Sequence, residues 1–207
     1  MRNALGALAC FVVAAVLALV AADVARWPDA LRAGDVRYRV APEEDGLWRP
    51  GQRVPGEPAR RLLGVGDDLE LRDALRTLRL SKLDNLVISD PKLALLRGEA
   101  RARLQALAGG DAEAATRSRA MGLLGALSFA SALNEVRERV THLQEAVRSF
   151  HDAIVTDPEN AEAKLNLELA LQRSRGVEAA EGSGGPNPSP GGAGSRGAGA
   201  GTPGSGY

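Results

Sequence analysis

The sequence predicts an all-α protein with a membrane anchor at its N-terminus. Residues 4–22 carry no charged side chain. After Gly66, apolar residues recur at intervals of three and four, which is typical of amphipathic helices. Aromatic residues make up only 3% of the chain, and no strand-rich alternation competes. The core must therefore be built from Leu, Ala and Val in closely packed helix pairs.

The first element is a predicted transmembrane helix, assigned to residues 1–25. Crossing a bilayer takes about 20 apolar residues, and residues 4–22 just meet that length. A cleaved signal peptide is the competing interpretation, since small residues precede Asp23, but its apolar region is usually about 7–15 residues long. We expect a retained anchor. Cys10 is the only cysteine, so it excludes an intramolecular disulfide and is interpreted as a small residue facing lipid.

The charges beside the anchor bear on its orientation. Arg26 and Arg32 follow the apolar run, and positive residues tend to remain in the cytoplasm. Nearby acidic residues carry little weight in that rule. The charges alone therefore lean slightly against export of the rest of the chain.

An irregular, proline-rich stalk or strap is predicted over residues 26–66. Val36, Tyr38 and Val40 alternate with charged residues, which favours one short extended segment. Four prolines then forbid a long regular element: Pro42, Pro50, Pro55 and Pro58. We expect Trp48 to be buried against its own domain as the apolar anchor of the strap, with partner binding as the alternative.

A helical domain is predicted over residues 67–176. Its first amphipathic segment starts near Leu69, and Asp90-Pro91 supplies a cap and a first-turn proline for the next helix, residues 92–108. Asp111 is expected to cap the helix after that. Residues 177–207 are rich in Gly, Ser and Pro and should form a disordered tail.

The most regular spacing lies near the end of this domain. Apolar residues recur at i, i+3, i+4, i+7 and i+11, which is one stripe on a helix: Leu143, Ala146, Val147, Phe150 and Ile154. The segment 157–160 then stops the helix. A new helix starts near Ala161 and places Leu167, Ala170 and Leu171 on one face. The segment is predicted to be a helix–turn–helix with small residues on either side of Phe150.

These residues resemble the tetratricopeptide repeat (TPR). Its late-repeat pattern of Ala, Phe, Ala and Pro matches Ala146, Phe150, Ala153 and Pro158. Leu124-Gly125 matches the Leu-Gly of the first helix if the hairpin is lengthened around residues 134–140. Residues 161–171 resemble the opening helix of a next, incomplete repeat, with Leu167 as a packing residue. Glu168 departs from the pattern, which usually has Gly there. The resemblance covers roughly residues 119–175.

The layout as a whole is similar to small membrane TPR proteins of Bat-type clusters. Those proteins are encoded with MoxR-type AAA+ ATPases and proteins carrying von Willebrand factor A (VWA) domains. The resemblance implies a scaffold in a bacterial envelope complex, with VWA-domain membrane proteins as partners. It places the helical domain outside the cytoplasm and brings no enzyme activity with it.

The resemblance also implies a partner-binding face on the last helix, at Leu165, Asn166, Leu169 and Gln172. The spacing agrees in part, because Leu167, Ala170 and Leu171 already occupy the face that packs on the preceding helix. Leu165 and Leu169 then form a second apolar ridge that something must cover. The alternatives are that the strap covers this ridge through Trp48, or that the helix starting near Leu69 does.

The residues that usually carry chemistry form no recognisable site. No Ser/His/Asp order, HExxH pair or phosphate-binding loop is present. His142 and His151 point in different directions from one helix, so both are predicted to lie on the surface. The acidic group formed by Asp67, Asp68, Glu70 and Asp73 suits a helix N-terminus.

These observations predict no catalytic, cofactor-binding or metal-binding residue, no small-molecule substrate and no enzyme activity. Nearly balanced charge over residues 23–181 argues against nucleic-acid binding. Two function classes remain. The first is a tethered scaffold that binds a protein, and the second is a structural or regulatory membrane subunit without a groove.

Overall fold

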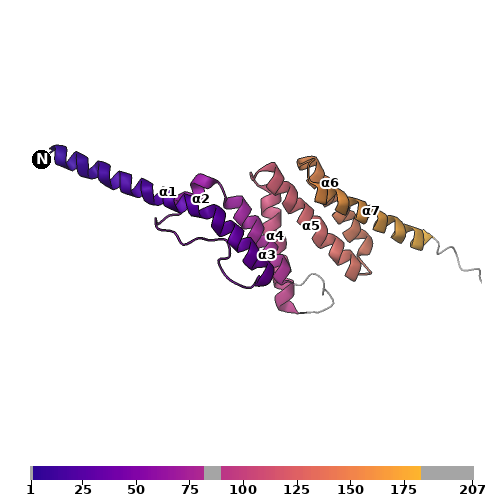
Figure 1. The fold of residues 1–207 in the computed structure, drawn as a ribbon. Coiled ribbons are helices and arrows are strands. Elements are labelled where there is room, and N and C mark those ends of the chain that lie inside the picture. Colours follow the sequence, from indigo (N-terminus) through magenta and orange to yellow (C-terminus); the bar gives the residue numbers. More distant parts are fainter. Residues whose placement is uncertain (1, 82–89, 183–207) are drawn as a thin grey trace, which may run out of the picture.

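The computed structural model describes residues 2–81 and 90–182. All regular elements in these ranges are helices, which confirms the all-α prediction. The helices are α1 (Arg2–Val40), α2 (Pro58–Leu63), α3 (Gly66–Leu80), α4 (Pro91–Gly109), α5 (Ala114–Asn134), α6 (Arg139–Thr156) and α7 (Ala161–Gly182). Figure 1 shows the N-terminal part of α1 projecting from a body of packed helices, with α7 at the opposite end.

The apolar start of α1 is a candidate membrane span. Its best window has a mean hydropathy of 2.6, and only 11% of that window is buried in the protein. Leu8, Phe11 and Leu17 are all more than half exposed. By length and composition, this part of the helix could cross a bilayer.

Helix α1 is longer than predicted, and the extended segment expected around Val36 to Val40 is wrong. The chain stays helical to Val40, even though Pro28 lies inside the helix. The helical signal comes from the face that packs against the domain, which carries Trp27, Leu31 and Tyr38 at helical spacing. The alternation of Val36 and Val40 is misleading because both side chains point to solvent.

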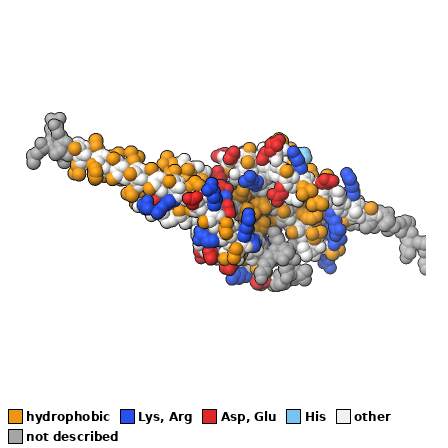
Figure 2. All heavy atoms as spheres, in the orientation of Figure 1, with side chains coloured by type: hydrophobic (Ala, Val, Ile, Leu, Met, Phe, Trp, Pro, Cys, Tyr) orange, Lys and Arg blue, Asp and Glu red, His pale blue; other side chains and the backbone are white. Residues whose placement is uncertain are grey.

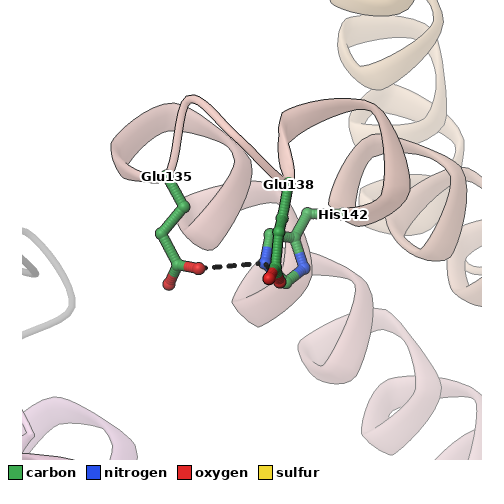
Figure 3. Close-up of side chains that lie close together, drawn as sticks. All are labelled: Glu135, Glu138 and His142. Atoms are coloured by element: carbon green, nitrogen blue, oxygen red, sulfur yellow. Dashed lines mark hydrogen bonds and ion pairs between the residues drawn. The ribbon is translucent and has the colours of Figure 1, made fainter.

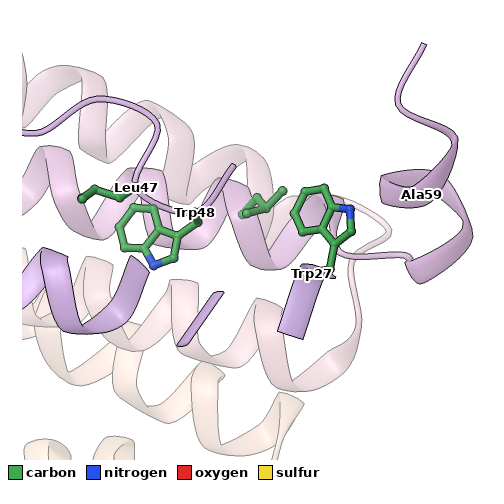
Figure 4. Packing of buried hydrophobic residues seen from close by; sticks show 5 residues of the cluster. Trp27, Leu47, Trp48 and Ala59 are labelled. Carbon is green, nitrogen blue, oxygen red and sulfur yellow. The ribbon is translucent and has the colours of Figure 1, made fainter. Parts of the chain in front are cut away.

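The strap is consequently shorter than predicted and spans residues 41–57. Trp48 is buried, as predicted, and its indole Nε1 donates to Asp35 Oδ1 at 2.9 Å. Its ring also packs on Tyr38, with centroids 5.4 Å apart. Figure 4 shows Leu47 beside Trp48 in the same buried cluster, with Trp27 and Ala59 further along. The strap thus joins α1, α2 and α3 in one small core.

Arginines of α3 bind the end of α1 and the start of the strap. Arg79 Nη1 donates to the Tyr38 carbonyl at 2.9 Å, and Arg76 Nε donates to the Pro42 carbonyl at 2.6 Å. Positive side chains are favourable at a helix C-terminus, where carbonyls lack helical partners. These bonds position α3 alongside the last turns of α1.

The remaining helices stack in chain order. Each of α3 to α7 packs on the next, and α3 with α5 and α5 with α7 also touch. Small apolar clusters lie between them, built mostly from Leu and Ala. Contacts between successive helices, together with those of α5 with α3 and α7, are compatible with helical hairpin repeats.

The helix ends follow the predictions in part. Asp90 caps α4, since its Oδ1 accepts a hydrogen bond from the Lys92 amide at 2.8 Å. The cap expected from Asp111 is wrong, because α5 begins only at Ala114, after Glu113, which makes no side-chain cap bond. Helix α7 continues past the predicted boundary at 176, through a stretch rich in Ala and Glu. The predicted tail beyond 182 lies outside the described residues.

Candidate functional site

The hairpin of α5 and α6 is centred on Phe150. The ring is 1% exposed and packs with Ala146 of α6 and Ala170 of α7. A Cβ added at Gly125 would lie 2.7 Å from Phe150 Cε1 and 2.8 Å from Cδ1, closer than real contacts. Gly125 is therefore needed because the ring lies against the backbone of α5. Leu124 lies next to it in a different cluster, with Leu71 and Leu104.

Polar contacts that sequence reasoning missed join the other end of the same hairpin. Ser118 Oγ of α5 donates to the Ala153 carbonyl of α6 at 2.7 Å, and it accepts from Asn160 Nδ2 at 2.8 Å. Asn160 Oδ1 also accepts from the Ala163 amide at 2.9 Å, which caps α7. Pro158 lies in the exposed turn between these helices. The sequence does signal the cap, because an Asn before a helix commonly caps it. The contact of Asn160 with Ser118 is not predictable in this way, since it depends on the fold.

The outer face of α7 carries the predicted partner residues. Leu165 is 58% exposed and Leu169 is 47% exposed. Asn166 is half-buried beside them, and Gln172 is exposed. Both alternatives for covering the ridge are wrong, because Trp48 packs with α1 and Leu69 of α3 at the other end of the body. Among the described residues, the ridge faces solvent.

A shallow groove runs along the opposite side of α7, where this helix meets α6. It has a volume of about 490 Å³. Its floor is formed by Val147, Leu167 and Leu171, and its rim includes Arg148 and His151. Since successive residues turn by about 100° on a helix, Leu167 and Leu171 point away from the ridge. Helix α7 thus presents apolar side chains on two sides.

A group of charged residues lies at the turn between α5 and α6 (Figure 3). His142 Nε2 lies 3.3 Å from Glu135 Oε2 and 3.6 Å from Glu138 Oε2. The predicted surface position of His142 is wrong, because its side chain is only 15% exposed under these carboxylates. His151 is a surface residue as predicted, with 66% of its side chain exposed.

These three residues could hold a cation, since their ligand atoms all lie within 4.8 Å of one another. The arrangement also has an explanation that needs no ligand. Glu138 stands immediately before α6, where the helix N-terminus favours negative charge. The carboxylates of Glu135 and Glu138 are exposed, and exposed carboxylates retain much of their hydration. The geometry supports an ion pair with His142 when the imidazole is protonated.

A hollow between the strap, α3 and α4 is lined by apolar side chains and by charged residues that pair with each other. It has a volume of about 410 Å³. Arg103 contacts Glu99 at 2.9 Å and Glu70 at 3.4 Å. Arg49 contacts Asp73 at 3.4 Å across the same hollow. Two of the carboxylates predicted to favour the N-terminus of α3, Glu70 and Asp73, therefore pair with arginines of α4 and the strap.

Comparisons with protein-family models, with curated proteins and with solved structures found no match.

Proposed function

We propose that this protein is a membrane-anchored helical scaffold that binds a protein partner through the exposed face of α7. The anchor is the apolar part of α1, which crosses the membrane once. The helical body lies on the extracytoplasmic side. The proposed partners are VWA-domain membrane proteins of a bacterial envelope complex linked to a MoxR-type ATPase, as the resemblance to Bat-type TPR proteins implies.

The ridge of Leu165 and Leu169 is the observation that supports this proposal best. The two leucines lie one turn apart and are about half exposed, although α7 already buries Ala163 and Ala170 on its other side. A helix that ends a stack normally has a polar outer face. Apolar side chains on both faces instead favour contact with a further helix or peptide. Asn166 and Gln172 add amide groups that can bond a peptide backbone at the edge of the ridge.

The proposal is tested by the double substitution Leu169→Glu with Asn166→Ala. It should leave the fold intact, because Leu169 is exposed, and it should strongly reduce the recovery of partner proteins from native membranes. Leu95→Glu is the matched control, since Leu95 of α4 is 72% exposed and lies away from α7. Full partner recovery by a folded double mutant would rule out the α7 surface.

The strap core favours a second candidate, a structural membrane subunit without a groove. Trp27 and Trp48 pack in one buried cluster that joins α1 to the strap, α2 and α3. A subunit of this kind would bind neighbouring membrane proteins through α1 itself. It predicts that the α7 double mutant keeps its partners, whereas exchanging residues 4–22 for an unrelated apolar span loses them.

A further inference from the structure

We infer that α2, through Leu62, Leu63 and its arginines, contacts the surface of the membrane that α1 enters. The helical body then rests on the bilayer. This inference depends on the proposed anchoring by α1 and is independent of the partner surface on α7. It follows from where α2 is fixed along α1 and from the side chains that α2 exposes.

Asp23 fixes the strap at the end of the apolar segment. It is the first charged residue after the run 4–22, yet it is only 3% exposed. Its Oδ2 accepts hydrogen bonds from the backbone amides of Arg53 at 2.9 Å and Val54 at 3.3 Å. A helix rises about 1.5 Å per residue, so these strap residues lie within a turn of the predicted bilayer boundary.

Helix α2 lies at the same level. Ala59 of α2 is buried in one cluster with Trp27, which is one turn beyond Asp23, and Val24 packs against that cluster. Helix α3 follows the later turns of α1, because Arg72 pairs with Asp35 and Arg79 bonds the Tyr38 carbonyl. The start of α3 therefore points back toward the membrane. In Figure 1, α2 lies beside α1 at the end of the body from which the bare part of α1 projects.

The exposed side of α2 combines apolar and basic side chains. Leu62 is 71% exposed and Leu63 is 38% exposed. Arg61 is exposed beside them, while Arg60 shares its charge with Glu57 at 3.1 Å. Figure 2 shows basic side chains, with acidic ones among them, where the apolar helix meets the body.

Exposed leucines next to arginines suit a helix that lies at a membrane interface. The apolar side chains enter the headgroup boundary, and the long basic side chains reach the lipid phosphates. Lipid is the expected binding partner of this surface, because α1 brings the bilayer to the same level. A cytoplasmic or extracytoplasmic protein would have to displace lipid already next to α1.

The test measures membrane depth in the full-length protein. The protein is reconstituted into vesicles of phosphatidylcholine and phosphatidylglycerol that contain nitroxide-labelled lipids, with the nitroxide either at headgroup level or deep in the acyl chain. An environment-sensitive fluorophore is attached at Leu62→Cys in a Cys10→Ser background. The matched control is Val155→Cys in the same background, since Val155 of α6 is 68% exposed and distant from α2. A third sample carries the fluorophore on the native Cys10.

The headgroup-level nitroxide should quench the fluorophore at position 62 several-fold more strongly than the one at position 155. Quenching at 62 should also weaken when phosphatidylglycerol is left out. The Cys10 sample separates the two proposals, because its fluorophore should be quenched by the deep nitroxide. Equal quenching at 62 and 155 with Cys10 still quenched would overturn the membrane contact and leave the anchor standing. Loss of quenching at Cys10 would overturn both.

Discussion

Single residues without side chains decide how closely the helices of this protein approach. Gly125 lets the Phe150 ring lie against the backbone of α5. Gly34 does the same for the strap, because a Cβ there would collide with the Leu47 carbonyl and the Trp48 ring. Gly122, on the same helix as Gly125, has no atom of another described segment within 4 Å of an added Cβ. The contacts, rather than the residue type, determine what each glycine contributes.

Alanine substitutions at the two glycines of α5 should have opposite effects on stability. Gly125→Ala should lower the free energy of unfolding by about 1–2 kcal/mol, because overpacking outweighs the gain in helix propensity. Gly122→Ala should raise it by up to about 1 kcal/mol, since only the propensity changes. Thermal unfolding in detergent, followed by circular dichroism, measures both. A stabilising Gly125→Ala would contradict the close approach of Phe150.

Removal of the Phe150 ring should be the most damaging truncation in this hairpin. Phe150→Ala should cost about 3–5 kcal/mol, because the buried ring leaves a cavity between three helices. Val155→Ala is the control on the same helix, and it should change stability by less than about 0.5 kcal/mol because Val155 is exposed. A Phe150→Ala protein that melts like the wild type would refute the packing.

At the scale of elements, the continuity of α1 is the main feature. One helix carries both the apolar segment and a full face of the domain core, so the apolar segment joins the body without a non-helical linker. The strap closes this joint from the outside. Arg37 Nη2 donates to the Leu47 carbonyl at 2.9 Å. Nearer the N-terminus of α1, Asp23 accepts hydrogen bonds from the amides of Arg53 and Val54. The joint is therefore held by polar bonds at two levels of α1.

Asp23→Ala should release the part of the strap that lies next to the end of the apolar segment. It leaves two part-buried backbone amides without their protein acceptor, which weakens the attachment of the strap to α1. Trypsin should then cleave after Arg53 much faster than in the wild type. Asp29→Ala is the control on the same helix, because its carboxylate is 84% exposed and contacts only Arg32 at 3.5 Å. Equal cleavage rates in both variants would show that Asp23 does not hold the strap.

At the scale of the whole molecule, the proposed anchor, the α2 surface and the α7 ridge follow one another along the length of the protein. The first two lie at the end of the body from which the apolar part of α1 projects, and the ridge lies at the far end (Figure 1). A partner bound to α7 would thus be held away from the bilayer by the length of the helix stack. The contacts of α1 with the strap and α3 would keep that distance fixed.

Reporter fusions at the C-terminus test the orientation of the body. The resemblance to envelope TPR proteins predicts active alkaline phosphatase and dark green fluorescent protein, because only an exported phosphatase folds and only a cytoplasmic fluorescent protein matures. The reverse result would place the body in the cytoplasm, as Arg26 and Arg32 by themselves favour. The proteins compared are full-length fusions expressed at equal levels.

Much of the fold could be predicted because the signals are local. The apolar run, the cap at Asp90 and the stripe through Phe150 each depend on neighbouring residues, and each lies on the helix expected for it. The continuation of α1 past Pro28 could not be read in this way. It depends on Trp27 and Tyr38 finding partners in the strap and α3, which are distant in sequence.

The sequence by itself determined the helical class, the candidate anchor and the spacing that pairs α6 with its neighbours, because periodicity records which residues share a face. Only the tertiary structure decided which faces are covered. It left Leu165 and Leu169 open, buried most of His142 beneath two carboxylates, and placed α2 beside the end of the apolar segment. Coverage depends on contacts between distant segments, and a local pattern cannot record whether such a contact forms.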